Sequence, residues 1–165
     1  MQDSYAGLSY EETVRKYAQT VASACLMRLN NYADAEDCFQ NTFMKLYTTS
    51  PSLKDEAHLK AWLLRVAINE CKNTLRIRGR ILPLDAAQQM PVFLDEDADA
   101  DSFPAMLMQL RPKYREAIYL HYCEGYRVEE IARILDRNPN TVKTLLRRGR
   151  EKLKEIYGGE SFEEA

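Results

Sequence analysis

A cluster of cationic and amide side chains near the C-terminal end of the sequence has the composition and the spacing to bind DNA. Between Pro139 and Lys154 there are six basic residues and one acidic residue. Such side chains can hydrogen-bond to base edges or hold phosphates. A solvated amphipathic face is the simpler interpretation, and the charge imbalance argues against it. The candidate DNA-reading residues share the outward side of one predicted helix: Asn140, Lys143, Thr144, Arg147 and Arg148.

These side chains must be presented by a suitable element, and residues 127–157 predict a helix, a short turn and a second helix. The turn is Asp136-Arg137-Asn138, where Asn138 caps and Pro139 opens the second helix. This pattern is typical of a DNA-binding helix-turn-helix, whose second helix enters the major groove. We expect Lys143 and Arg148 to contact base edges. The inward side of the second helix is predicted to carry Val142, Leu146, Gly149, Leu153 and Ile156.

The rest of the chain also predicts helices, and strand signals are nearly absent. A capping box of Ser9 and Glu12 precedes a helix to about Leu29. Further helices are expected over residues 33–47, 56–80 and 112–122, with Gly125 ending the last. The second is predicted to turn Ala35, Cys38, Phe39, Thr42, Phe43 and Leu46 inward and Asp34, Asp37, Asn41 and Lys45 outward. The apolar face of the third comprises Leu59, Trp62, Leu63, Val66, Ile68 and Leu75.

Charge divides the chain into blocks. The net charge of −2 is the balance of +2 over residues 1–82, −6 over 83–104, +5 over 105–157 and −3 over 158–165. Residues 83–104 also lose helical periodicity and hold three prolines, which is typical of a linker. We therefore predict an all-α chain with two small helical domains, residues 1–82 and 105–157, joined by an acidic flexible linker and followed by an acidic tail.

Composition excludes several classes of protein. With 45% hydrophobic and 29% charged residues, the sequence is that of a globular protein. It has no apolar run long enough to span a membrane and no signal peptide, so we expect a cytoplasmic protein without membrane insertion. The four cysteines form no C-x-x-C pair, which predicts buried thiols and no metal site.

Two sequence blocks resemble a known family. DAEDCFQNTFMKLY at residues 34–47 and HLKAWLLRVAIN at 58–69 resemble region 2 of bacterial sigma factors of the sigma-70 family. LRPKYREA at 110–117, EIARIL at 130–135 and NTVKT at 140–144 resemble region 4. Their order, their spacing and the short linker match the two-domain extracytoplasmic function (ECF) type. The resemblance implies a three- or four-helix bundle for residues 1–82 and a helix-turn-helix for 105–157.

The resemblance also implies partners and site residues. Core RNA polymerase would bind Asp37, Gln40 and Asn41, with Asn41 standing where an acidic residue is usual. The loop 48–56 and the helix after it would capture the unpaired minus-10 promoter strand through Asn69, Lys72, Asn73 and Arg76. Asn140, Lys143, Thr144, Arg147 and Arg148 would read duplex DNA at the minus-35 element. Trp62 is left out of the site as a core residue, because its neighbours Leu59, Leu63 and Val66 are apolar.

The expected function is promoter-specific transcription initiation, without a cofactor or a catalytic site. The resemblance leaves open an anti-sigma protein as a further partner. One alternative is an autonomous regulator that binds an operator as a dimer through the same helix-turn-helix. A second alternative is a metal-dependent hydrolase using Asp34, Glu36, Asp37 and His58, but the sequence lacks H-E-x-x-H and G-x-S-x-G motifs.

Overall fold

The computed structural model describes residues 4–29, 31–78 and 103–158, and all regular structure within these ranges is helical. The chain divides into two compact units, Met1–Pro91 and Val92–Ala165. The predicted all-α fold class is confirmed. The linker expected over residues 83–104 falls almost wholly outside the described residues.

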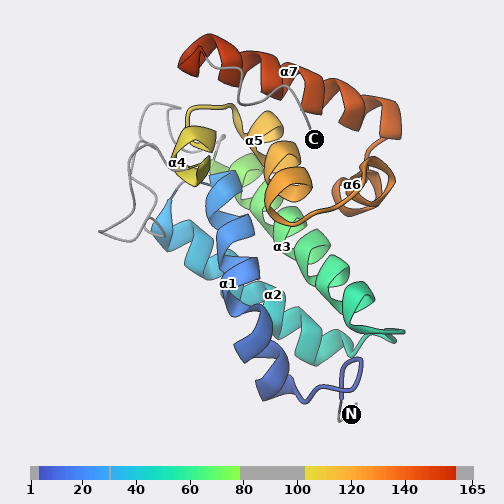
Figure 1. The fold of residues 1–165 in the computed structure, drawn as a ribbon. Coiled ribbons are helices and arrows are strands. Elements are labelled where there is room, and N and C mark those ends of the chain that lie inside the picture. Colours follow the sequence, from blue (N-terminus) through green and yellow to red (C-terminus); the bar gives the residue numbers. More distant parts are fainter. Residues whose placement is uncertain (1–3, 30, 79–102, 159–165) are drawn as a thin grey trace. The chain divides into compact units, whose positions relative to one another are not determined.

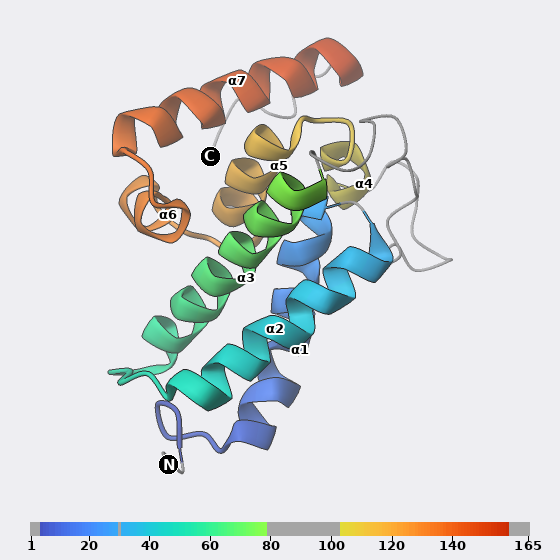
Figure 2. The same ribbon diagram turned by 180° about the vertical axis from the view of Figure 1, so that it is seen from behind.

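The described part of the first unit consists mainly of three long helices: α1 (Tyr10–Leu29), α2 (Tyr32–Thr49) and α3 (Glu56–Arg78). Figures 1 and 2 show them packed side by side, each against the other two. The capping box predicted before α1 is formed, since Ser9 N donates to Glu12 Oε2 at 2.8 Å and Glu12 N donates to Ser9 Oγ at 3.1 Å. The fully buried side chains at the centre of this bundle are Val21, Cys25, Leu46, Leu59, Leu64, Ala67 and Cys71.

The burial pattern corrects three predictions for this unit. Asp34 was expected on the outward side of α2, but it is buried, because it lies one helical turn before Cys38 on the same face. Leu75 was expected inside and is 37% exposed, since it lies in the last described turn of α3. Trp62 was expected in the core and is only half-buried. Helical periodicity gives the direction of a side chain but not the extent of the neighbour that covers it.

Residues 103–158 of the second unit contain four α-helices: α4 (Phe103–Leu107), α5 (Pro112–Ile118), α6 (Val128–Leu135) and α7 (Pro139–Tyr157). The single helix expected over residues 112–122 is instead α5 followed by a π-helix, Tyr119–Cys123. Gly125, at φ +77°, ends this stretch as predicted. Cys123 lies in the π-helix and is exposed, which corrects the expectation of four buried thiols.

Helix α7 crosses α5 at very close range. A Cβ atom added to Gly149 would lie 2.9 Å from Ile118 Cγ1 and 3.6 Å from Tyr114 Cβ. Val142, Leu146 and Leu153 are buried on the same side of α7. Ile156, the last residue of the predicted inward face, is 46% exposed, because it lies in the final turn of the helix.

Candidate polymerase and nucleic-acid interfaces

The predicted helix-turn-helix is formed by α6 and α7. Asp136 ends α6 in the left-handed region at φ 54°, and Asn138 caps α7 by accepting a hydrogen bond from Asn140 N at 2.8 Å. Pro139 is the first residue of α7. The first turn of α7 is therefore fixed by its own sequence, so that its exposed side chains project from a rigid element.

On α7 the structure brings all five sequence-predicted residues to the surface or near it. Asn140, Lys143, Arg147 and Arg148 are exposed, and Thr144 is half-buried with its Oγ1 donating to Asn140 O at 3.1 Å. At 3.6 residues per turn, Asn140 and Thr144 point most directly away from the buried side of α7, and Arg147 and Arg148 lie at equal angles on either side of that direction. Lys143 lies farther round the helix, beyond Arg147.

The two arginines have different neighbours. Arg147 Nη1 lies 3.3 Å from Glu151 Oε1, and both side chains are more than half exposed, so the pair is weak and can be exchanged for DNA. Arg148 lies near Tyr114 of α5 and acts on its pKa. Burial tends to raise the pKa of the Tyr114 phenol, but the hydrogen bond to Arg148 and the nearby positive charges leave it below its ordinary value. Arg148 therefore lies on the side of α7 that is nearer to α5.

On α2 the three sequence-predicted residues form one exposed stripe. Asp37, Gln40 and Asn41 are all exposed, at positions i, i+3 and i+4. The same side of the helix carries two exposed apolar residues that the sequence analysis did not include, Met44 at 60% and Tyr47 at 45% exposure. Exposed large apolar side chains clustered with polar ones are typical of protein interfaces.

A hollow of about 270 Å³ lies beside this stripe, between α1 and α2. Its wall includes Gln40 and Glu36 from the polar side and Leu26 and Phe39 from the apolar side. The exposed stripe on α2 therefore borders a hollow in the surface of this unit. No sequence signal could have found the hollow, because residues of two different helices line it.

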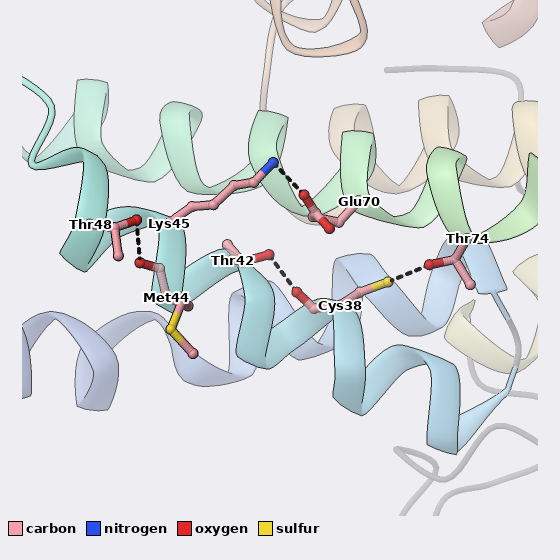
Figure 3. A network of polar contacts seen from close by, with 7 residues as sticks. All are labelled: Cys38, Thr42, Met44, Lys45, Thr48, Glu70 and Thr74. Carbon is pink, nitrogen blue, oxygen red and sulfur yellow. Dashed lines mark hydrogen bonds and ion pairs between the residues drawn. The ribbon is translucent and has the colours of Figure 1, made fainter. Parts of the chain in front are cut away.

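Side-chain contacts between α2 and α3 fix how the exposed sides of these two helices are held relative to each other within this unit. Lys45 Nζ lies 2.5 Å from Glu70 Oε1, and Cys38 Sγ lies 3.3 Å from Thr74 Oγ1 (Figure 3). Thr42 Oγ1 donates to Cys38 O at 2.7 Å within α2. These contacts leave the outer sides of both helices uncovered.

On α3 the four candidate residues also share one side of the helix. Asn69, Asn73 and Arg76 are exposed and Lys72 is half-buried. Arg65, which is exposed, and the half-buried Trp62 extend the same stripe toward the start of the helix. Both were omitted from the sequence-predicted site, although a spacing of i, i+3 and i+7 to Asn69 could have indicated them.

The loop before α3 is ordered by reciprocal hydrogen bonds. His58 N donates to Asp55 Oδ1 at 2.8 Å, and Lys54 N donates to His58 Nδ1 at 3.2 Å. Asp55 therefore caps α3, and the His58 ring is held by the backbone of Lys54. Asp34 of the alternative hydrolase site is buried. Within residues 4–29, 31–78 and 103–158, no group of histidine, cysteine and acidic side chains is arranged to hold a metal ion.

Both units match known protein families. The family model described as Sigma-70 region 2 matches residues 13–81, and the one described as Sigma-70, region 4 matches residues 100–153. The chain is 29% identical to "ECF RNA polymerase sigma factor SigE" of Mycolicibacterium smegmatis, over 99% of this chain and 67% of that protein. It is 28% identical to "RNA polymerase sigma factor CarQ" of Myxococcus xanthus, over 91% of this chain and 90% of that protein.

A solved structure agrees with these matches. The sigma factor RpoE of Bartonella quintana, in complex with the anti-sigma factor NepR, aligns with a TM-score of 0.75 and 25% identity, over 92% of this chain and 98% of that one. The order of the two regions, the fold and the relatives all agree. The chain therefore belongs to the sigma-70 family of RNA polymerase sigma factors, of the extracytoplasmic function type.

Proposed function

We propose that this chain binds core RNA polymerase through the outer side of α2 and directs it to promoters that α7 and α3 recognise. The observation that carries the proposal is the separation of three exposed, chemically distinct surfaces on a fold matched by both sigma-70 regions. An autonomous operator-binding regulator would not account for the region 2 match over residues 13–81. In this role the chain acts in the cytoplasm and supplies no catalytic site.

The polymerase-binding surface consists of Asp37, Gln40 and Asn41, extended by Met44 and Tyr47. Carboxylate and amide groups supply directional contacts, while the two apolar side chains supply area that binding removes from water. A polymerase partner with a complementary basic and apolar surface would satisfy both.

The minus-35 surface is the outward line of α7. We assign base contacts to Asn140 and Thr144, which point away from the buried side of α7, and to Arg147, which lies beside them on the side away from Tyr114 of α5. Lys143 and Arg148 flank the line and are placed to contact the phosphates on either side of the groove. The expected effect is that the amides and Arg147 supply selectivity, whereas the flanking cations supply affinity.

The proposed minus-10 surface extends along α3 and is not confined to a single pocket. Glu56 and Asn69 are thirteen residues apart on α3, which corresponds to about 20 Å along a helix. One unpaired base cannot contact both the loop at residues 50–55 and Asn69, so the strand must run along the helix. Trp62 lies between them and is half-buried, so that it is a candidate to stack on a base, and the exposed Arg65 can hold the backbone.

In vitro transcription with purified core polymerase tests the proposal. Core alone, core with this chain and core with the triple variant Asn140→Ala, Thr144→Ala, Arg147→Ala would be run on a promoter library, followed by mapping of transcript starts. We expect discrete starts only with the unchanged chain, each preceded by shared minus-35 and minus-10 sequences. Discrete binding to duplex DNA without polymerase, and no transcription with it, would instead support the autonomous regulator.

A further inference from the structure

Helix α1 contacts the chain on both sides of the loop that joins α2 to α3. This loop, residues 50–55, belongs to the proposed minus-10 surface, and we call it the minus-10 loop. Helix α1 packs against both of the helices that the loop connects (Figures 1 and 2). Tyr10 Oη donates a hydrogen bond to Phe43 O of α2 at 3.0 Å, and Tyr17 Oη donates one to Glu56 Oε2 of α3 at 3.2 Å. The surfaces described above include neither of these tyrosines.

The first contact lies near the end of α2, where the minus-10 loop begins. Besides the hydrogen bond to Phe43 O, the ring of Tyr10 packs edge to face against Tyr47, with ring centroids 5.4 Å apart and an interplanar angle of 74°. Aromatic pairs in this arrangement attract each other beyond the effect of buried area. Tyr47 O in turn accepts a hydrogen bond at 3.1 Å from the hydroxyl of Ser50, the first residue of the loop. Tyr10 therefore holds the last turns of α2 through both its hydroxyl and its ring.

A short turn ahead of α1 helps to place Tyr10 itself. Tyr5 N donates to Leu8 O at 2.6 Å and Leu8 N donates to Tyr5 O at 3.0 Å, while Ala6 and Gly7 between them have positive φ. Such paired bonds around two residues of positive φ are typical of a tight reverse turn. The buried Tyr5 ring packs edge to face against Tyr10, with ring centroids 6.3 Å apart. The ring of Tyr10 is thus in contact with two other aromatic rings, which limits the directions open to its hydroxyl.

The second contact lies at the start of α3, where the minus-10 loop ends. Glu56 is the first residue of α3, and its carboxylate both accepts the hydrogen bond from Tyr17 and pairs with Lys16 Nζ. The ion pair is weak, because the Lys16 and Glu56 side chains are 51% and 40% exposed. The hydrogen bond from Tyr17 is charge-assisted and comes from a buried residue, so it is the stronger of the two contacts. Tyr17 therefore holds α3 at the residue next to Asp55, the last residue of the loop.

We propose that Tyr10 and Tyr17 are positioning residues for the minus-10 loop, which hold its two ends at a fixed separation for binding of the unpaired promoter strand. The two residues are seven positions apart, so they lie on one face of α1, about 10 Å from each other along the helix. Because a helix is rigid, this spacing sets the distance between the end of α2 and the start of α3. A loop whose ends are already in place loses less conformational freedom on binding. The inference rests on the proposed minus-10 function, and it assigns neither tyrosine a contact with the strand.

Amide hydrogen exchange of the free protein, measured by NMR, tests whether the two hydroxyls hold the loop. Tyr10→Phe and Tyr17→Phe each remove one hydroxyl and keep the ring, and Tyr157→Phe, at an exposed tyrosine in the last turn of α7, is the matched control. The amides of Ser50 and His58 report on the two ends of the loop, because both are hydrogen-bonded there. We expect Tyr10→Phe to accelerate exchange at Ser50 and Tyr17→Phe to accelerate it at His58, each by about 2- to 10-fold, the equivalent of one hydrogen bond. Exchange rates equal to those of the control in both variants would overturn the proposal.

Strand binding by the holoenzyme tests whether the placement of the loop matters for recognition. The probe is a fluorescent single-stranded oligonucleotide with the minus-10 sequence found by the mapping of transcript starts, added to core polymerase reconstituted with each variant. Tyr10→Phe and Tyr17→Phe should each weaken strand binding by about 2- to 10-fold, because a smaller fraction of the loop is in the binding conformation. Affinity for core polymerase and for minus-35 duplex DNA should equal that of the control.

Two results would contradict the positioning role. Unchanged strand binding in both variants would show that the loop does not need the two hydroxyls, and equal losses of strand, polymerase and duplex binding would show a general structural role instead. If the holoenzyme with the unchanged chain bound no promoter strand, the proposed function would fail. The exchange measurements would then still decide whether the two tyrosines hold the loop, because they use the free protein.

Discussion

Asp37 offers the most direct test of polymerase docking at the scale of a single residue. It is exposed on α2 and forms part of no described core contact, so Asp37→Arg should leave the fold unchanged. Reversing a charge at an interface places like charges together, and we expect binding to core polymerase to weaken by about 1 to 3 kcal/mol. A competition assay with labelled sigma factor would measure this. Glu11→Arg, an equal charge change at an exposed position of α1, is the control, and equal affinity of both variants would remove Asp37 from the interface.

Arg147 and Arg148 are adjacent in sequence but should respond differently to truncation. Both lie at equal angles to the outward direction of α7, but Arg148 lies on the side of Tyr114 of α5, whose pKa it helps to lower, while Arg147 lies beside the exposed Glu151. Arg147→Ala should cost about 1 to 3 kcal/mol at the preferred minus-35 sequence and flatten selectivity at one base pair. Arg148→Ala should weaken all sequences alike. Transcription from a randomised minus-35 library would separate the two, and the reverse result would return base reading to Arg148, as the sequence had suggested.

Trp62 tests whether the minus-10 strand runs along α3. We expect Trp62→Leu to slow promoter opening, because base stacking on an aromatic ring contributes about 1 to 3 kcal/mol. Trp62→Phe, which keeps an aromatic face, should retain most of the activity. Permanganate reactivity of unpaired thymines would follow the opening. If the two variants opened promoters equally well, Trp62 would have only a packing role.

At the scale of elements, the close crossing of α5 and α7 depends on Gly149. Replacing glycine with alanine inside a helix normally stabilises it by about 1 kcal/mol. At this position the added Cβ would lie 2.9 Å from Ile118 Cγ1, so one of the helices must shift. Overpacking of this kind costs about 1 to 3 kcal/mol, and we expect Gly149→Ala to be destabilising overall.

Thermal unfolding of the isolated variant would report the sign of this effect. Glu151→Ala, at an exposed position of the same helix, controls for helix propensity without adding volume at the crossing. An increase in stability for Gly149→Ala would mean that Ile118 moves aside without cost. The predicted fall in stability would show that the orientation of the DNA-reading helix is set by this contact.

At the scale of the whole molecule, each unit has its own buried core. The first is centred on residues such as Leu46 and Leu64, and the second on Ile118 and Leu146. We expect fragments 1–82 and 105–165 to fold separately, with cooperative thermal transitions observed by circular dichroism. When the two fragments are mixed without a covalent connection, they should support transcription only at much higher concentration than the intact chain. In the intact chain the linker gives each unit a high effective concentration relative to the other. Fragments without cooperative transitions would show that each unit requires the other.

The sequence by itself determined the helical class, the limits of most helices and the family. Capping residues such as Ser9 and Asn138 act over one turn, so α1 and α7 begin where the pattern predicts. Apolar periodicity likewise acts along one element, and it correctly turned Leu46 and Leu146 inward. Motifs shared with the family identified the two regions because they are contiguous in the chain.

Only the tertiary structure decided which side chains are covered and which meet. Asp34 is buried and Leu75 and Ile156 are exposed, because burial depends on how far the neighbouring helices extend. The contact of Cys38 with Thr74 and the ion pair of Lys45 with Glu70 join residues that are distant in sequence. Such contacts are set by how helices cross, and the crossing of α5 and α7 follows from the space left by Gly149. Helical periodicity describes one helix at a time and therefore contains none of these distances.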